Sequence, residues 1–209
     1  RVLFRSDRTT AARAVELGLV MATSGLACAY YGIFAGGMIS GAAIWFAIAQ
    51  GRWRDHRYWL MVALAAVVCV GVIAPFFVPY IQMQESTGFQ RTLSGQYSAN
   101  LGAWLSSSAW AHRWWYGSLT APSEVLFPGI LAIVLGVSGA RLALRGASRA
   151  AAWFYIGLAV FTLWLTFGPD AGLYTALYYT VPVFSFLRAP SRAGVVVVLC
   201  LVVLAAPAM

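Results

Sequence analysis

Long apolar stretches, separated by short polar segments that carry arginine, make up most of the chain. A membrane-crossing helix needs about 17–25 apolar residues, because the hydrocarbon core is about 30 Å thick and a helix rises about 1.5 Å per residue. The pattern predicts an all-α fold, a polytopic transmembrane bundle of about six spans that forms one domain over residues 1–209. The predicted spans are 15–34, 36–51, 58–84, 125–144, 150–169 and 193–209.

The first apolar stretch, Leu17 to Gly51, is too long for one ordinary span and just long enough for two short ones. Gly36-Gly37 is the predicted turn between them. Arginine clusters precede and follow the stretch, and two cytoplasmic clusters require an even number of crossings between them. The alternative, one long tilted helix, would place one of these clusters outside.

The arginines also predict the orientation, since cytoplasmic loops carry an excess of positive charge. Ten of the 14 basic residues fall on the predicted inner side. We therefore expect an integral membrane protein with both ends of this chain in the cytoplasm. The chain starts at Arg1 and its last apolar run has no polar exit, which suggests an internal fragment of a longer protein.

Composition narrows the function classes. The chain is 61% hydrophobic and only 10% charged, whereas soluble domains are about 25% charged. The net charge of +8 does not indicate nucleic-acid binding, because such proteins gather their basic residues on a polar face. The three cysteines lie inside apolar runs, and their spacing predicts neither a disulfide framework nor a metal site.

Two external segments follow from this topology, residues 85–124 and 170–192. Apolar residues recur at near-helical spacing within Ser98–Tyr116, and several tryptophans accompany them. This pattern predicts a helix in the headgroup layer with tryptophan anchors, and an aromatic platform for a sugar or lipid is the alternative. A second short helix is predicted from Leu173 to Val181, ended by Pro182.

Arg188 and Arg192 lie at the external mouth of the last span, against the usual charge bias. A guanidinium presents a planar fork of donors suited to phosphate or carboxylate, so the pair could hold a lipid phosphate. The alternatives are bilayer headgroups, Asp170 or Glu124 as partners. Further candidates for substrate binding are Tyr97, Arg113 and His112, although a lone histidine in an aromatic segment is more often an interfacial residue.

The candidate catalytic groups are the external carboxylates Glu85, Glu124 and Asp170. Such a group could act as general base for an acceptor hydroxyl or hold a divalent metal as cofactor, but their spacing selects neither role. Glu124 also fits a plain helix start, because Pro122-Ser123 precedes it and an apolar run follows.

Four motifs carry a resemblance to a family. They are Gly168-Pro169 through Tyr178-Tyr179 and on through Pro182-Val-Phe-Ser-Phe-Leu-Arg188-Ala-Pro190-Ser-Arg192, the early Ala29-Tyr-Tyr-Gly-Ile-Phe34, Tyr97-Ser-Ala-Asn100-Leu101, and Ser123-Glu-Val-Leu-Phe-Pro-Gly129. Taken in their order along the chain, these motifs resemble those of bacterial polytopic proteins related to the GT-C glycosyltransferases and the YfhO-like membrane proteins.

The resemblance implies a multi-spanning transferase of a bacterial inner membrane, which takes a sugar from a polyprenyl-phosphate carrier on the non-cytoplasmic face. Together with the outward position of the two arginines, it suggests that Arg188 and Arg192 help form the surface that receives the lipid-linked sugar. It also implies that the catalytic acid lies in an earlier external loop, before this chain begins. Similar sequences commonly have an acid where this chain has Asn100, which cannot act as a base. A noncatalytic partner in envelope polysaccharide assembly and a lipid or solute transporter remain the alternatives.

Overall fold

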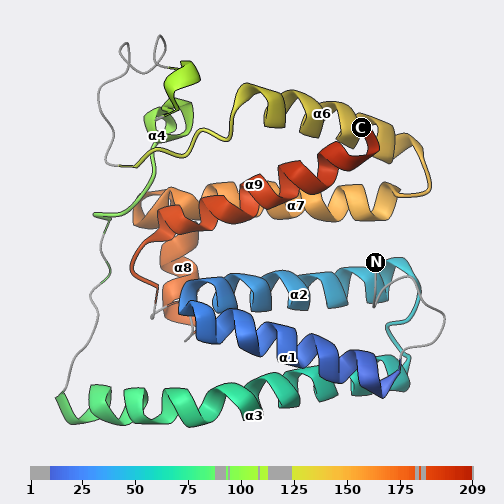
Figure 1. Ribbon diagram of the computed structural model, residues 1–209, viewed down its shortest axis with the longest axis vertical. Coiled ribbons are helices and arrows are strands. Elements are labelled where there is room, and N and C mark those ends of the chain that lie inside the picture. The colour runs from blue at the N-terminus through green and yellow to red at the C-terminus, as the bar shows by residue number, and fades with distance from the viewer. Residues whose placement is uncertain are drawn as a thin grey trace. The chain divides into compact units, whose positions relative to one another are not determined.

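The computed structural model describes residues 10–87, 93, 95–107, 109–112, 124–181, 184 and 187–208, and over these residues the chain is helical with no strand (Figure 1). The chain divides into two compact units, Arg1–Gln90 and Arg91–Met209. The first holds α1 (Ala11–Ala27), α2 (Ala29–Ala49) and α3 (His56–Thr87). The second holds α4 (Leu101–Leu105), η1 (Trp110–His112), α6 (Ile130–Arg145), α7 (Arg149–Thr166), η2 (Gly168–Ala171), α8 (Leu173–Thr180), η4 (Pro190–Ala193), α9 (Gly194–Ala205) and η5 (Ala206–Ala208).

Helices of membrane-spanning character confirm the predicted class. Within the described residues four segments are long and apolar enough to cross a bilayer: Ala29–Ala49, His56–Met83, Arg149–Thr166 and Pro190–Ala208. Large apolar side chains cover their outer faces, as Leu60, Val67 and Val70 on α3 illustrate, each more than 60% exposed. Such faces suit lipid rather than water.

The first two helices divide at Cys28, so the predicted turn at Gly36-Gly37 is wrong. Cys28 is extended, with φ −159° and ψ 121°, and α2 starts at the next residue. The sharp reversal requires the two backbones to touch, because a Cβ on Gly32 would lie 2.5 Å from the Cα of Gly25. Two glycines facing each other across the turn allow this approach, whereas Gly36 and Gly37 have open space beside them.

Helix α1 packs against both α2 and α3. Its contact with α3 is close because Gly18 has no side chain: a Cβ there would lie 2.5 Å from the Ala65 carbonyl oxygen. Gly25 repeats this one heptad later against Ile73. Helix α3 continues through Pro75 and Pro79 to Thr87, so it includes the backbone of Glu85, which the sequence placed in the external loop.

A turn held by hydrogen bonds and an ion pair joins α2 to α3. Gly51, at φ 67°, lets the Arg52 N–H donate to the Ala47 carbonyl (2.7 Å), which closes α2 in a Schellman motif. Asp55 then caps α3 by accepting from the Tyr58 N–H (3.2 Å). The Arg52 guanidinium donates twice to the same carboxylate, at 3.1 and 3.2 Å.

This cap predicts a pH-dependent contribution to stability. The Tyr58 N–H, followed by the Arg52 guanidinium, holds the pKa of the Asp55 carboxyl below its ordinary value. A lowered folded-state pKa means that the contribution is present at neutral pH and is lost as the pH falls through that pKa. Asp55→Ala should lower the thermal unfolding temperature by a few degrees at neutral pH, and the difference from wild type should vanish in acid. Asp55→Asn, which keeps the cap without the ion pair, should fall between them, and a difference that persists unchanged in acid would contradict this assignment.

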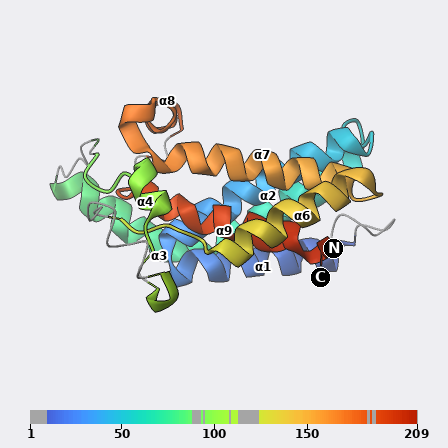
Figure 2. The same ribbon diagram turned by 90° about the horizontal axis from the view of Figure 1, so that it is seen from above.

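In the second unit α6, α7 and α9 lie side by side, with α6 parallel to α9 and α7 antiparallel to both (Figure 1). Gly136 and Gly139 of α6 face the backbone of α9 at Leu201 and Leu204, which brings these two helices into direct backbone contact. Ala143, Ala152 and Leu204 form a buried cluster where α6 and α9 end and α7 begins. Helix α8 leaves the end of α7 and runs crosswise to it (Figure 2).

Two further predicted boundaries are wrong. Helix α6 starts at Ile130 rather than Val125, because residues 124–129 are not helical and two of them pair with the carbonyls of Ala103 and Ser106. Gly129 is the N-cap of α6, so Glu124 caps no helix. The single interfacial helix predicted within Ser98–Tyr116 is interrupted as well, since Ser106 and Ser107 between α4 and η1 are not helical. Serine side chains compete for backbone partners, and the Ser106 hydroxyl donates to the Gly102 carbonyl (2.7 Å).

Candidate functional site

One end of the second unit gathers segments that lie far apart in the sequence. They are residues 97–107, 124–129, 166–171 and 187–194. The Ala99 N–H donates to the Thr166 carbonyl at the end of α7 (2.8 Å), and the Ser191 N–H donates to the Tyr97 carbonyl (3.1 Å). The stretch from Tyr97 to Ala99 is thereby fixed between the end of α7 and the start of the last helical segment.

Residues 124–129 join the same end through two backbone hydrogen bonds. The Leu126 N–H donates to the Ala103 carbonyl (2.8 Å), and the Phe127 N–H donates to the Ser106 carbonyl (3.2 Å). Leu126 and Trp104 also approach Gly194 at the start of α9, where a Cβ would lie 3.3 Å from Leu126 Cδ2. We call this assembly of 97–107, 124–129, 166–171 and 187–194 the outer end, after the side of the membrane that the sequence predicts for it.

Hydroxyl groups form the interior of the outer end. Trp104 Nε1 donates to Thr166 Oγ1 (3.0 Å), and this fully buried hydroxyl donates in turn to the Leu163 carbonyl (2.6 Å). Ser98 Oγ is buried against Gly168 and has no hydrogen-bond partner within the described part of the chain. Gly168 has φ 69°, and a Cβ there would overlap the Ser98 hydroxyl. The outer end therefore packs around a glycine that no other residue could replace without strain.

Tyr97 and Arg188, both predicted as substrate-binding residues, are brought together at this end. The Arg188 guanidinium carbon lies 4.9 Å from the centroid of the Tyr97 ring, and Arg188 Nη2 donates to the Tyr97 hydroxyl (3.1 Å). Arg188 is exposed while Tyr97 is half-buried. The aromatic ring thus supports a cation at the surface through both a cation–π contact and a hydrogen bond.

The backbone beside Arg188 is held firmly. Leu187 and Ala189 on either side are buried, at 4% and 6% exposed. The buried Tyr174 of α8 donates its hydroxyl to the Leu187 carbonyl (2.5 Å). Arg188 is therefore an exposed residue between two buried neighbours. Because these neighbours are packed, the backbone from which the Arg188 side chain extends is held in place.

Three of the remaining candidates lie on the outer end, and His112 lies beside it. Arg192 is exposed on η4 and Asp170 is exposed on η2, while Glu124 is half-buried in the non-helical run before α6. His112 is half-buried on η1, where its Nδ1 lies 3.0 Å from Ser107 Oγ and its ring meets Phe127 edge-on at 5.3 Å. These contacts give His112 a packing role in the fold of this segment.

Two candidates fall outside the description. The Glu85 backbone lies in the last turn of α3 in the first unit, but its side chain lies outside the described part of the chain, and so does the whole of Arg113. Among the described residues no group of three or more histidine, cysteine, aspartate or glutamate side chains could hold a metal ion. The described carboxylates therefore provide no assembled metal centre.

Sequence reasoning did not identify Ser98, Thr166 and Ser191 as parts of this end, because small hydroxyl residues near apolar runs are common and carry no spacing signal. The outer end presents an exposed guanidinium on a well-packed backbone, which is suited to binding a phosphate or carboxylate.

The chain matches no protein-family model, no curated protein and no solved structure with which it was compared.

Proposed function

We propose that this chain is part of an integral membrane glycosyltransferase of the GT-C-like kind, which uses a polyprenyl-phosphate-linked sugar on the non-cytoplasmic face. The observation that carries the proposal is the Arg188–Tyr97 pair. Arg188 is exposed between two buried residues, and its guanidinium contacts the Tyr97 ring and donates to the Tyr97 hydroxyl. A phosphate between a membrane-embedded tail and a sugar is the group that such a cation would hold at a bilayer surface.

The proposed topology has about six crossings of a bacterial inner membrane, with both ends of the chain in the cytoplasm. In the second unit the arginine-bearing turn between α6 and α7 lies at the end opposite the outer end, because α7 runs from Arg149 to Thr166. Arg141, Arg145 and Arg149 would then face the cytoplasm, as the positive-inside rule favours, and Arg188 would face outward. The shorter α1 and α6 would complete the six crossings beside the four longer segments.

In this proposal Arg188 binds the carrier phosphate and Arg192 supplies further positive charge from the same mouth. Glu124 and Asp170 are the described candidates for the general base that activates an acceptor hydroxyl, with Glu85 as a third. Both described carboxylates belong to segments of the outer end, which supports a shared surface for donor and acceptor. A divalent metal would need ligands beyond the described carboxylates.

A noncatalytic partner of envelope polysaccharide assembly is the second candidate, and Asn100 favours it. The Asn100 side chain accepts from the Ala103 N–H (2.7 Å) and caps α4. The position thus serves local structure, where the resembling sequences commonly carry an acid. Carrier binding without turnover would decide for this candidate, since the phosphate site requires no base.

The test is binding of a polyprenyl-phosphate sugar by the protein in vesicles, compared among variants at equal abundance. Arg188→Ala should weaken binding roughly 10- to 100-fold, because hydrogen bonds to charged groups are worth about 1.5–3 kcal/mol. Tyr97→Phe should cause a smaller loss, since the ring remains under the guanidinium. Arg145→Ala removes the same charge from the opposite end of the unit and should leave binding unchanged.

Turnover is measured in the same vesicles with Glu124→Gln and Asp170→Asn. A variant that binds the carrier normally but transfers no sugar would identify the base. Equal binding by wild type and Arg188→Ala, or no binding by wild type, would overturn the proposal.

A further inference from the structure

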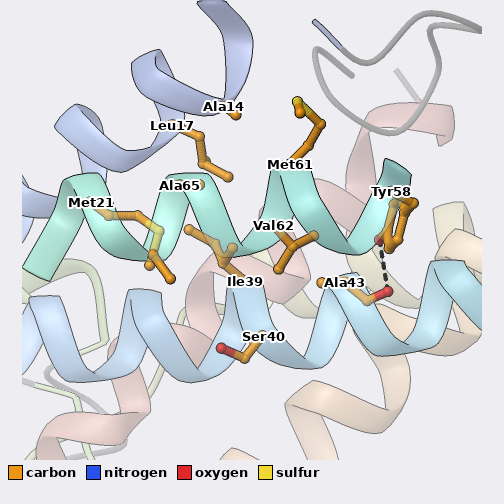
Figure 3. Close-up of a pocket in the computed structure, with 11 residues that line it drawn as sticks. Ala14, Leu17, Met21, Ile39, Ser40, Ala43, Tyr58, Met61, Val62 and Ala65 are labelled. Atoms are coloured by element: carbon orange, nitrogen blue, oxygen red, sulfur yellow. Dashed lines mark hydrogen bonds between the residues drawn. The ribbon is translucent and has the colours of Figure 1, made fainter. Parts of the chain in front are cut away.

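A cavity lies among the three helices of the first unit (Figure 3). It is lined by Leu17 and Met21 of α1, Ile39 and Ser40 of α2, and Met61 and Val62 of α3, which Figure 3 draws as sticks. Its volume is about 80 Å³. By the same measure one water needs about 10–15 Å³, so the cavity has room for roughly five to eight groups of the size of a water or a methylene. That is the volume of a short stretch of one hydrocarbon chain.

The cavity exists because small residues line it where the helices face each other. Ala14, Ala43, Ala65 and Ala66 contribute to its wall. At one end Tyr58 crosses between α3 and α2, and its hydroxyl donates to the Ala43 carbonyl (2.8 Å), as the dashed line in Figure 3 marks. The remaining lining is apolar apart from Ser40, and an apolar cavity of this kind excludes water while its wall lacks dispersion contacts.

Arginine residues adjoin the Tyr58 end of the cavity. The Arg52 guanidinium carbon lies 5.1 Å from the centroid of the Tyr58 ring, and Tyr58 lines the cavity. Arg52 also pairs with Asp55 (3.1 Å). Arg13 directly precedes the lining residue Ala14 on α1. The charged residues close in sequence to Ala14 and Tyr58 carry a net positive charge: Arg13, Glu16, Arg52, Arg54, Asp55 and Arg57.

The geometry points to a binding site for an anionic phospholipid, with one acyl chain in the cavity among α1, α2 and α3 and its phosphate between Arg13 and Arg52. An apolar slot that ends beside the Arg52 guanidinium, with Arg13 next to its lining residue Ala14 on α1, matches the two parts of such a lipid, a hydrocarbon chain joined to a negative headgroup. A zwitterionic lipid fits the slot equally but gains less from the arginines. The site lies in the first unit and is independent of the proposed transferase function.

The first arm of the test fills the cavity. The full chain is purified from membranes into detergent containing phosphatidylglycerol and phosphatidylcholine in equal amounts, and retained lipid is counted by native mass spectrometry. Ala66→Phe places a ring from the exposed rim of the cavity into its space and should remove the retained phosphatidylglycerol. Ala63→Phe adds the same ring at an exposed position of α3 that does not line the cavity, and it should retain lipid as wild type does.

The second arm removes the cations and leaves the cavity. Arg13→Gln combined with Arg52→Gln should lower the preference for phosphatidylglycerol over phosphatidylcholine about tenfold, with total lipid occupancy preserved. Helical content by circular dichroism shows whether each variant is folded. The inference is overturned if folded Ala66→Phe keeps its phosphatidylglycerol, if wild type shows no preference between the two lipids, or if a crosslinker at Ser40 captures another helix of the chain instead of lipid.

Discussion

Gly139→Ala is expected to lower the free energy of unfolding by about 3 kcal/mol, the upper end of the usual cost of overpacking. The added Cβ would overlap the Leu204 carbonyl oxygen and would lie 3.0 Å from the Leu204 carbonyl carbon and 3.1 Å from the Ala205 Cα. All three atoms belong to the backbone of α9, which cannot move aside as a side chain can. Helices α6 and α9 must therefore move apart, and this movement removes the contacts along the face that they share.

Matched glycines of the second unit provide the controls for this prediction. Gly136→Ala should cost less, because its nearest neighbour is the flexible Leu201 Cδ2 at 2.9 Å. Gly157→Ala on α7 has no atom within 4 Å of the added Cβ and should stabilise the helix by about 0.5–1 kcal/mol. Reversible unfolding in mixed detergent micelles measures all three variants. If Gly139→Ala costs no more than Gly157→Ala, α6 and α9 are not in backbone contact at Gly139.

The same glycines explain why the sequence predicted the helical class but misplaced the first turn. Apolar length alone indicated two helices between Leu17 and Gly51, and two are present. Gly36-Gly37 was the natural break by composition, yet both lie inside α2. The reversal occurs at Cys28 because Gly25 and Gly32 let α1 and α2 touch there. Contact between residues of different helices decides the turn, and a local pattern does not contain that information.

The start of α6 shows the same limit at the outer end. Val125 to Gly129 is apolar enough to extend the helix, but Leu126 and Phe127 pair with the carbonyls of Ala103 and Ser106 instead. Those partners lie about 20 residues earlier in the chain. Hydrogen bonds between residues this far apart in the sequence compete with helix formation, but they leave no periodic pattern of apolar residues from which they could be predicted.

The candidate site was predictable in part. Charge bias singled out Arg188, because an arginine at a predicted external mouth departs from the positive-inside rule. Tyr97 entered through a short motif with no visible link to Arg188, and their contact spans 91 positions of the sequence. The buried hydroxyls that surround Tyr97 could not be foreseen, since Ser98, Thr166 and Ser191 acquire their roles only through tertiary packing.

Gly168→Ala should destabilise the second unit by about 3 kcal/mol through two effects that act together. The residue has φ 69°, which costs an alanine about 1–2 kcal/mol. The added Cβ would also overlap Ser98 Oγ, lie 2.8 Å from Ser98 Cβ and lie 3.2 Å from Pro190 Cγ. Because Ser98 follows Tyr97, displacement of Ser98 should also weaken the contact between Tyr97 and Arg188.

Gly172→Ala separates the two effects, since Gly172 has φ 77° but no atom within 4 Å of an added Cβ. This variant should show the backbone cost alone, about 1–2 kcal/mol. Adding Ser98→Gly to Gly168→Ala removes the overlap and should return the loss to about the Gly172→Ala level, which gives a favourable coupling in the double-mutant cycle. Thermal unfolding of the four proteins measures the cycle. Additive losses would mean that Ser98 does not pack on Gly168, and the arrangement of the outer end around Tyr97 would then have to be abandoned.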